Sequence, residues 1–207
     1  MPSIYELKPR FQQLLRPLLR ALHGAGISAN AVTVTAGLAS VAYGGWLLLA
    51  PGSGWAWGLL PAFLLLRMAL NAVDGMLARE YNQQSRLGAI LNEVGDVVAD
   101  AALYVPFAWL PGTAVGLGLG LLVVFLAVLT ELVGVLGQVV GGGRRYDGPC
   151  GKSDRAVLYG ALALAVALGL PVRLYLTYGF AALALLLAFT TWNRARQALR
   201  AAATSPN

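Results

Sequence analysis

The sequence predicts an all-α integral membrane protein, with six transmembrane helices preceded by an N-terminal amphipathic interfacial helix. Of its 207 residues, 58% are hydrophobic and only 12% are charged. The apolar residues gather in long runs, several of them near the roughly 20 residues that a spanning helix needs. The segment 4–22 differs, because its apolar positions recur at helical spacing with basic residues between them.

The segment 4–22 is therefore expected to lie on the membrane surface, with a bend near Pro17. Its apolar positions are Ile4, Leu7, Phe11, Leu14, Leu15, Leu18, Leu19 and Leu22, and its basic residues are Lys8, Arg10, Arg16 and Arg20. We divide the chain into an interfacial helix with its linker (1–28), a six-helix bundle (29–193) and a tail (194–207). The tail ends in small polar residues and is expected to be disordered there.

Six apolar runs follow the interfacial helix. The spans are expected at 31–50, 55–79, 87–110, within 113–140, at 156–170 and at 174–192. The run 113–140 is longer than a bilayer requires, so it tilts or projects into water. Gly116 and Gly120 within it have the spacing of a small-residue contact surface between helices.

The basic residues indicate an orientation. Among 15 Lys and Arg, only Arg67 lies in the interior of a span, while Arg79 ends one at the polar loop, and only Arg173 lies in a turn on the opposite side. All the others fall in the N-terminal segment, the two polar loops near 80–86 and 141–155, and the tail. The positive-inside rule then places both termini and both loops in the cytoplasm, most simply that of a bacterial inner membrane.

The stretch 71–100, NAVDGMLAREYNQQSRLGAILNEVGDVVAD, is unusually polar for a membrane helix. Polar groups are costly there and are usually paired, hydrated or functional. Asn71, Asp74 and Ala78 share one helix face, and Gly88, Asn92, Asp96 and Asp100 share another. The polar segment 81–86 reads as a turn between them, so a helical hairpin brings the two faces together.

Oxygen ligands that converge from two helices suit a hard divalent cation such as Mg²⁺. Gly75, Ala78 and Gly88 keep the walls of this site low enough for a ligand to approach the backbone. Glu93 lies about 100° around the helix from Asn92 and is not an obvious further ligand. Asp100 lies one turn beyond Asp96 and is a better auxiliary, while Arg67 is expected to pair with an acid such as Asp100 or Glu131.

The stretch resembles the signature of the CDP-alcohol phosphatidyltransferases, D-x-x-D-G-x-x-A-R-x8-G-x3-D-x3-D. The matching residues are Asp74, Gly75, Ala78, Arg79, Gly88 and Asp96. Asn71 and Asn92 stand where the family has its first and third aspartates. The six-span layout extends the resemblance over most of the chain.

The resemblance implies a transferase of phospholipid synthesis that uses a CDP-linked lipid, such as CDP-diacylglycerol, and an alcohol, and that releases CMP. It implies Mg²⁺ or Mn²⁺ held at Asn71, Asp74, Asn92 and Asp96, with Asp96 also the catalytic base. The nucleotide-binding positions are then Asp74, Gly75, Ala78, Arg79 and Gly88. The resemblance and the small-residue surfaces together suggest a homodimer.

Arg144, Arg145, Lys152 and Arg155 fall on the same predicted cytoplasmic face. Lys152 and Arg155 are candidates for the phosphate of a phosphorylated acceptor or for a lipid headgroup. Positive-inside anchoring explains all four equally well. The acceptor stays open between glycerol phosphate, inositol phosphate, serine and another phospholipid headgroup.

Two other functions are weighed against the transferase. Asn71 and Asn92 are compatible with a non-catalytic or weakly active paralogue that binds lipid or nucleotide, and a small transporter is a third possibility. A nucleic-acid partner is not expected, because no basic stripe with interleaved aromatic residues occurs. Cys150 is the single cysteine, which excludes an internal disulfide.

Overall fold

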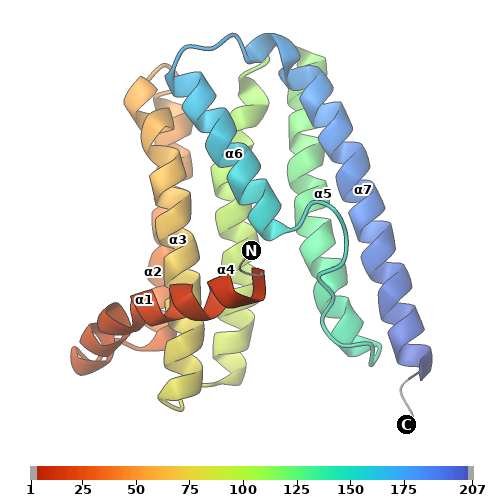
Figure 1. Cartoon of the computed structure of the whole chain (residues 1–207). Coiled ribbons are helices and arrows are strands. Elements are labelled where there is room, and N and C mark those ends of the chain that lie inside the picture. Colours follow the sequence, from red (N-terminus) through yellow and green to blue (C-terminus); the bar gives the residue numbers. More distant parts are fainter. Residues whose placement is uncertain (1–3, 205–207) are drawn as a thin grey trace. The chain divides into compact units, whose positions relative to one another are not determined.

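The computed structural model describes the backbone of residues 4–204 and the side chains of residues 11–204. Within that range the chain is all helical, without a strand, which confirms the all-α part of the prediction. Figure 1 follows the helices along the chain. They are α1 (Ile4–Gly24), α2 (Ala29–Leu49), α3 (Gly54–Glu80), α4 (Arg86–Tyr104), η1 (Val105–Trp109), α5 (Ala114–Val139), α6 (Lys152–Ala167) and α7 (Arg173–Thr204).

Four of these helices, α2, α3, α5 and α7, are long and apolar enough to cross a membrane. The third and fifth predicted spans are not among these four helices. The third is split, because Pro106 opens the short 3-10 helix η1 after α4, and α4 itself carries the acids of the polar stretch. The fifth corresponds to α6, which has only 16 residues.

The tail is more ordered than the sequence suggests. Helix α7 continues through Thr204, so only residues 205–207 of the tail lie outside the described range. Arg194 and Ala198, which the sequence assigns to the tail, are 2% and 4% exposed. Burial of these two side chains explains why the helix extends past the predicted end of the sixth span.

The exposed surface of the spanning helices is apolar. Phe125 on α5 and Leu185 and Phe189 on α7 are more than half exposed. Large apolar side chains in such numbers are unfavourable in water but are the expected lining of a lipid-facing surface. The composition of the helices and their outer surfaces therefore agree on an integral membrane protein.

The described residues form two compact units. The first contains Met1–Ala42 and Ala62–Ala99, which bring α1, most of α2, the second part of α3 and most of α4 together. The second contains Tyr43–Pro61 and Asp100–Asn207. The polar hairpin from Asn71 to Asp96 therefore belongs to the first unit.

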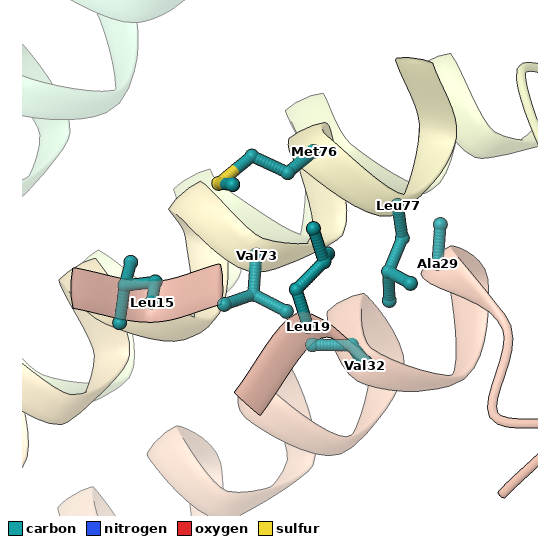
Figure 2. Packing of buried hydrophobic residues seen from close by; sticks show 7 residues of the cluster. All are labelled: Leu15, Leu19, Ala29, Val32, Val73, Met76 and Leu77. Carbon is teal, nitrogen blue, oxygen red and sulfur yellow. The ribbon is translucent and has the colours of Figure 1, made fainter. Parts of the chain in front are cut away.

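The core of the first unit fastens α1 to the helix that carries the first half of the polar motif. Leu15 and Leu19 of α1 pack against Val73, Met76 and Leu77 of α3, together with Ala29 and Val32 of α2 (Figure 2). Leu19 is 1% exposed. Complete burial of one leucine contributes about 2 kcal/mol by the area rule. Helix α1 is therefore held from its inner face, whereas Leu14 on its outer face is 76% exposed.

In the second unit, small residues of α5 serve contacts within the chain. A Cβ atom at Gly120 would lie 2.7 Å from the Cα atom of Ala108 in η1 and 3.1 Å from the ring of Phe180 in α7. A Cβ atom at Gly116 would collide with Pro111. The predicted small-residue surface at Gly116 and Gly120 is thus occupied by the chain's own helices.

Candidate active site

A cavity of about 730 Å³ opens within the first unit. Its walls come from the beginnings of α2 and α4, the end of α3 and the turn between α3 and α4. Of the residues singled out in the sequence, it is lined by Asn71, Asp74, Gly75, Ala78, Arg79, Gly88 and Asn92. The two halves of the polar motif therefore meet around one space, as the hairpin prediction requires.

The α3 wall holds a nearly buried carboxylate. Asp74 is 4% exposed, and the hydroxyl of Thr33 on α2 donates to its Oδ2 atom at 2.7 Å. A hydrogen bond to a charged carboxylate is stronger than one between neutral groups and fixes its orientation. Thr33 thus orients a candidate metal ligand from a third helix.

Asp96 lies on α4 as the centre of a polar group, although it is not among the residues that line the cavity. The Nδ2 atom of Asn71 donates to its Oδ1 atom at 2.7 Å. The guanidinium of Arg67 lies 3.4 Å from the same Oδ1 atom and donates to the Asp96 carbonyl at 3.1 Å. Arg67 therefore has Asp96 as an ion-pair partner, which the sequence reasoning missed.

Both helices that begin at the cavity are capped by serine. The Ser28 hydroxyl accepts from the backbone N–H of Ala31 at 3.2 Å, and the Ser85 hydroxyl accepts from that of Gly88 at 2.9 Å. Gln83, in the α3–α4 turn, accepts from the N–H of Ala29 at 2.7 Å. These bonds fix two helix N-termini, the positive ends of helix dipoles, at one cavity.

Arg79 and Arg86 add two cationic side chains to the same lining. A Cβ atom at Gly75 would lie 3.2 Å from Nη1 of Arg79, so this guanidinium lies directly against the glycine backbone. Positive helix ends combined with arginines are a favourable environment for phosphate groups. The cavity lining thus combines the carboxylate of Asp74 with the two arginines Arg79 and Arg86.

Gly88 lies close to two polar side chains, those of Asn30 and Ser85. A Cβ atom there would lie 2.7 Å from Oδ1 of Asn30 and 3.0 Å from the Ser85 hydroxyl. Since both atoms are side-chain ends, a Cβ atom here would displace the Asn30 amide and the Ser85 hydroxyl that caps α4. This agrees with the expectation that small residues keep the cavity wall low.

The oxygen ligands present fit a divalent metal ion by type but carry little charge. Asp74 and Asp96 are carboxylates, whereas Asn71 and Asn92 offer neutral carbonyl oxygens. Across the described residues, no three histidine, cysteine, aspartate or glutamate side chains gather closely enough to form a metal group. Hard cations such as Mg²⁺ and Mn²⁺ accept such oxygen ligands.

Sequence reasoning missed part of the lining. Glu93, set aside because it points about 100° away from Asn92, also lines the cavity, as do Asn30, Thr33 and Gln83. The cavity is wide enough for two successive helix positions to reach it. A polar residue at the start of the first span, such as Thr33, was the available signal for the α2 contribution.

The residues expected to contact the acceptor lie in the second unit, along with Asp100. Arg145 pairs with Asp147 at 2.7 Å. Arg155 is fully buried and pairs with Glu131 at 2.8 Å and with Asp100 at 3.5 Å. Asp100, expected as an auxiliary to the metal site, therefore belongs to an internal ion-pair group. The guanidinium of Arg144 lies 5.1 Å from the ring centre of Tyr146, and Lys152 begins α6.

Residues 27–192 match the CDP-alcohol phosphatidyltransferase family. The inner membrane protein YnbA of Escherichia coli is 46% identical over 197 residues, which cover 95% of this chain and 96% of that protein. The phosphatidylinositol phosphate synthase of Mycolicibacterium smegmatis is 29% identical over 110 residues, 53% of this chain and 48% of that protein.

The fold has solved counterparts as well. The crystal structure of Mycobacterium tuberculosis phosphatidylinositol phosphate synthase with CDP-DAG bound has a TM-score of 0.74 at 21% identity, covering 94% of this chain and 96% of that one. The same protein in complex with manganese and citrate has a TM-score of 0.72 at 22% identity, covering 92% and 90%.

The chain belongs to the CDP-alcohol phosphatidyltransferase family. This membership places it among membrane transferases. The match covers both halves of the polar motif and continues through α5 and α6 to Trp192.

Proposed function

We propose that this chain transfers a phosphatidyl group from a CDP-linked lipid, CDP-diacylglycerol in the first instance, to an alcohol and releases CMP. The observation that carries the proposal is the single cavity around which both halves of the motif meet. Phosphoryl transfer needs alignment and charge neutralisation more than covalent machinery. Two arginines and a set of carboxylate and amide oxygens in one lining supply both for a pyrophosphate.

The cavity lining and Asp96, which is hydrogen-bonded to the lining residue Asn71, each have a role in this reaction. Arg79, Gly75, Ala78 and Gly88 form the wall for the nucleotide and its phosphates. The acceptor hydroxyl gives its proton to the carboxylate of Asp96, while its oxygen forms a bond to the phosphorus nearest the lipid. The bond from that phosphorus to the CMP oxygen breaks, and CMP leaves with the electron pair.

A divalent cation, Mg²⁺ or Mn²⁺, held by Asn71, Asp74, Asn92 and Asp96 would neutralise the charge of the pyrophosphate when bound. Thr33 holds the carboxylate of Asp74 ready for this task. Arg67 and Asn71 hold that of Asp96. The crystal structure of the mycobacterial synthase with manganese supports a metal-dependent site in this fold.

The reaction is tested by an acceptor screen. Purified protein in lipid nanodiscs receives CDP-diacylglycerol, Mg²⁺ or Mn²⁺ and one alcohol at a time, and CMP release is measured. We expect CMP with at least one acceptor and none when the metal is removed. Absence of CMP with every acceptor, in protein that still binds CDP-diacylglycerol, would contradict catalysis.

That last outcome would favour the second candidate function, a paralogue that binds a CDP-lipid without turning it over. One contact motivates it. The amide nitrogen of Asn71, rather than an oxygen, faces Asp96 at 2.7 Å. An aspartate at this position would instead present an oxygen ligand to the metal, so the asparagine lowers both the charge and the number of ligands.

We also propose six spans, with both termini and the cavity on the cytoplasmic side and α1 at the interface. The distribution of basic residues and the exposed outer face of α1 support this arrangement. After replacement of Cys150 by serine, single cysteines at Ser53 and Thr204 are expected to react with a membrane-impermeant thiol reagent from opposite sides. Labelling of both from one side would contradict the layout.

A homodimer with one complete site in each chain is the assembly we propose. Both motif halves line one cavity of a single chain, so no residue from a second copy is needed. Mixed dimers of Asp74→Asn and Asp96→Asn chains are therefore expected to stay inactive in the CMP assay. If the site were shared between the two chains, a mixed dimer would contain one intact site. Recovery of about half the wild-type rate per dimer would therefore show a shared site instead.

A further inference from the structure

The loop between α5 and α6 (residues 140–151, Figure 1) carries the basic residues that the sequence assigns to a phosphorylated acceptor. Two arginines near this loop, Arg155 and Arg194, are buried inside the protein. Arg155 is 0% exposed and Arg194 is 2% exposed. Together with Glu131 and Asp100 they form a buried group, called here the inner ion-pair cluster, with two positive and two negative side chains.

The charges of the inner ion-pair cluster are matched inside the protein. Glu131 lies 2.8 Å from Nη2 of Arg155 through Oε1 and 3.3 Å from Nη1 of Arg194 through Oε2. Asp100 lies 3.5 Å from Arg155. A phosphate dianion placed here would meet two carboxylates as well as two guanidinium groups, so it would gain little net attraction.

The donors of these arginines are also committed to the backbone. Arg155 donates through Nη1 to the carbonyl of Cys150 at 3.1 Å. Arg194 donates to the carbonyl of Thr130 at 2.8 Å and to that of Asp147 at 3.2 Å. Two of these carbonyls belong to the loop. The arginines therefore hold the loop in place, and a ligand phosphate would have to displace those bonds.

A third arginine follows the same pattern nearer the surface. Arg145 donates through Nε and Nη2 to the two carboxylate oxygens of Asp147, at 2.7 and 2.9 Å. This forked arrangement is the one that arginine otherwise uses for a phosphate. Here a carboxylate two residues further along the chain already occupies it.

The loop is fixed by close backbone approach as well. A Cβ atom at Gly134 would lie 2.7 Å from the carbonyl oxygen of Arg145, whose N–H donates to the Gly134 carbonyl at 3.0 Å. At Gly148, φ is +117° and a Cβ atom would lie 3.0 Å from the Cα atom of Thr190. The loop is thus held on α5 and α7 in the geometry that pairs its arginines.

From these contacts we infer that the acceptor is an alcohol without a phosphomonoester group, such as a polyol or an amino alcohol. The inference rests on the proposed transferase function and narrows its acceptor. The internally paired arginines supply structure rather than a phosphate site. Arg144 in the loop and Lys152 at the start of α6 are partly exposed, and we assign them to the anionic membrane surface on the cytoplasmic side.

Matched acceptors test the inference directly. CMP release from CDP-diacylglycerol is measured with glycerol against glycerol phosphate, with inositol against inositol phosphate, and with serine. We expect the better unphosphorylated alcohol to exceed its phosphate ester in kcat/KM by at least about tenfold. A preference for either phosphate ester by the wild-type protein would overturn the inference.

Two variants remove carboxylates that pair with the arginines of the loop and of the inner ion-pair cluster. Asp147→Asn removes the carboxylate that pairs with Arg145 at a partly exposed position, and Glu131→Gln removes the carboxylate that Arg155 and Arg194 share. Each is expected to raise kcat/KM for a phosphate ester relative to its parent alcohol. Ser153→Asn, an exposed substitution on α6, is the control and should leave this ratio unchanged. If Glu131→Gln does not fold, Asp147→Asn still decides, and an unchanged ratio in it counts against the inference.

Binding separates this inference from the transferase proposal. If no acceptor yields CMP, the transferase proposal fails, and calorimetry with glycerol phosphate on CDP-diacylglycerol-loaded protein decides the inference. No heat of binding to the wild type, with measurable binding to Asp147→Asn, supports it. Binding to the wild type that Arg145→Gln abolishes overturns it.

Discussion

Replacement of Asp96 by asparagine is expected to reduce CMP release by at least about a hundredfold, the usual contribution of a general base. The variant loses the carboxylate that accepts from Asn71 and pairs with Arg67. It also removes one of only two carboxylates in the proposed metal set. The rate is measured with saturating CDP-diacylglycerol and the best acceptor from the screen.

A matched control separates chemistry from folding. Glu80→Gln also removes one carboxylate from the first unit, where Glu80 pairs with Arg16 at 3.2 Å on the exposed surface. Exposed pairs contribute little to stability, so this variant should retain the wild-type rate. Size-exclusion profiles and thermal unfolding of all three proteins verify the fold. Near-normal turnover by a folded Asp96→Asn protein would remove Asp96 from the mechanism.

The second large effect concerns Asn71 and Asn92. With aspartate at both positions, the lipid-free protein is expected to bind Mg²⁺ or Mn²⁺ at least about tenfold more tightly than the wild type. An aspartate at position 71 would replace the amide that now donates to Asp96 at 2.7 Å, so two carboxylates would face each other. Their repulsion is relieved by a cation between them.

Metal titration by calorimetry, with and without CDP-diacylglycerol, measures this effect. In the wild type two carboxylates balance one divalent ion, so we expect one metal without lipid and a second, if any, only with the pyrophosphate present. Gln84→Glu adds a negative charge to the cavity lining outside the proposed ligands and should change the affinity much less than Asn71→Asp. Two tight sites in the lipid-free wild type would contradict this account.

The hairpin was predictable because its information is local. Helical periodicity alone places Asp74 on the polar face of the first helix, and Gly88 and Asn92 on that of the second. The polar turn between the two helices appears directly in the sequence. The structure places all three around one cavity. The end of α7 was less predictable, since the burial of Arg194 depends on partners far away in the chain.

The contacts that orient the site were not predictable, since they join distant segments. Thr33 reaches Asp74 across 41 positions, and nothing in the local pattern of either residue indicates the other. The burial of Arg155 could not be predicted for the same reason. Its position in a basic loop suggested a surface role, but its pairing with Glu131 on α5 emerges only from tertiary packing.

The packing of α1 has a consequence for how the membrane reaches the chemistry. Leu15 and Leu19 pack against α3 through Val73, Met76 and Leu77. Leu14 and Arg20 of α1 are exposed, an apolar and a basic side chain of the kinds that suit a lipid surface. In the proposed arrangement, lipid that holds α1 also supports the helix that carries the proposed metal ligands Asn71 and Asp74. The bilayer is then a mechanical component of the proposed active site, in addition to being the store of the proposed substrate.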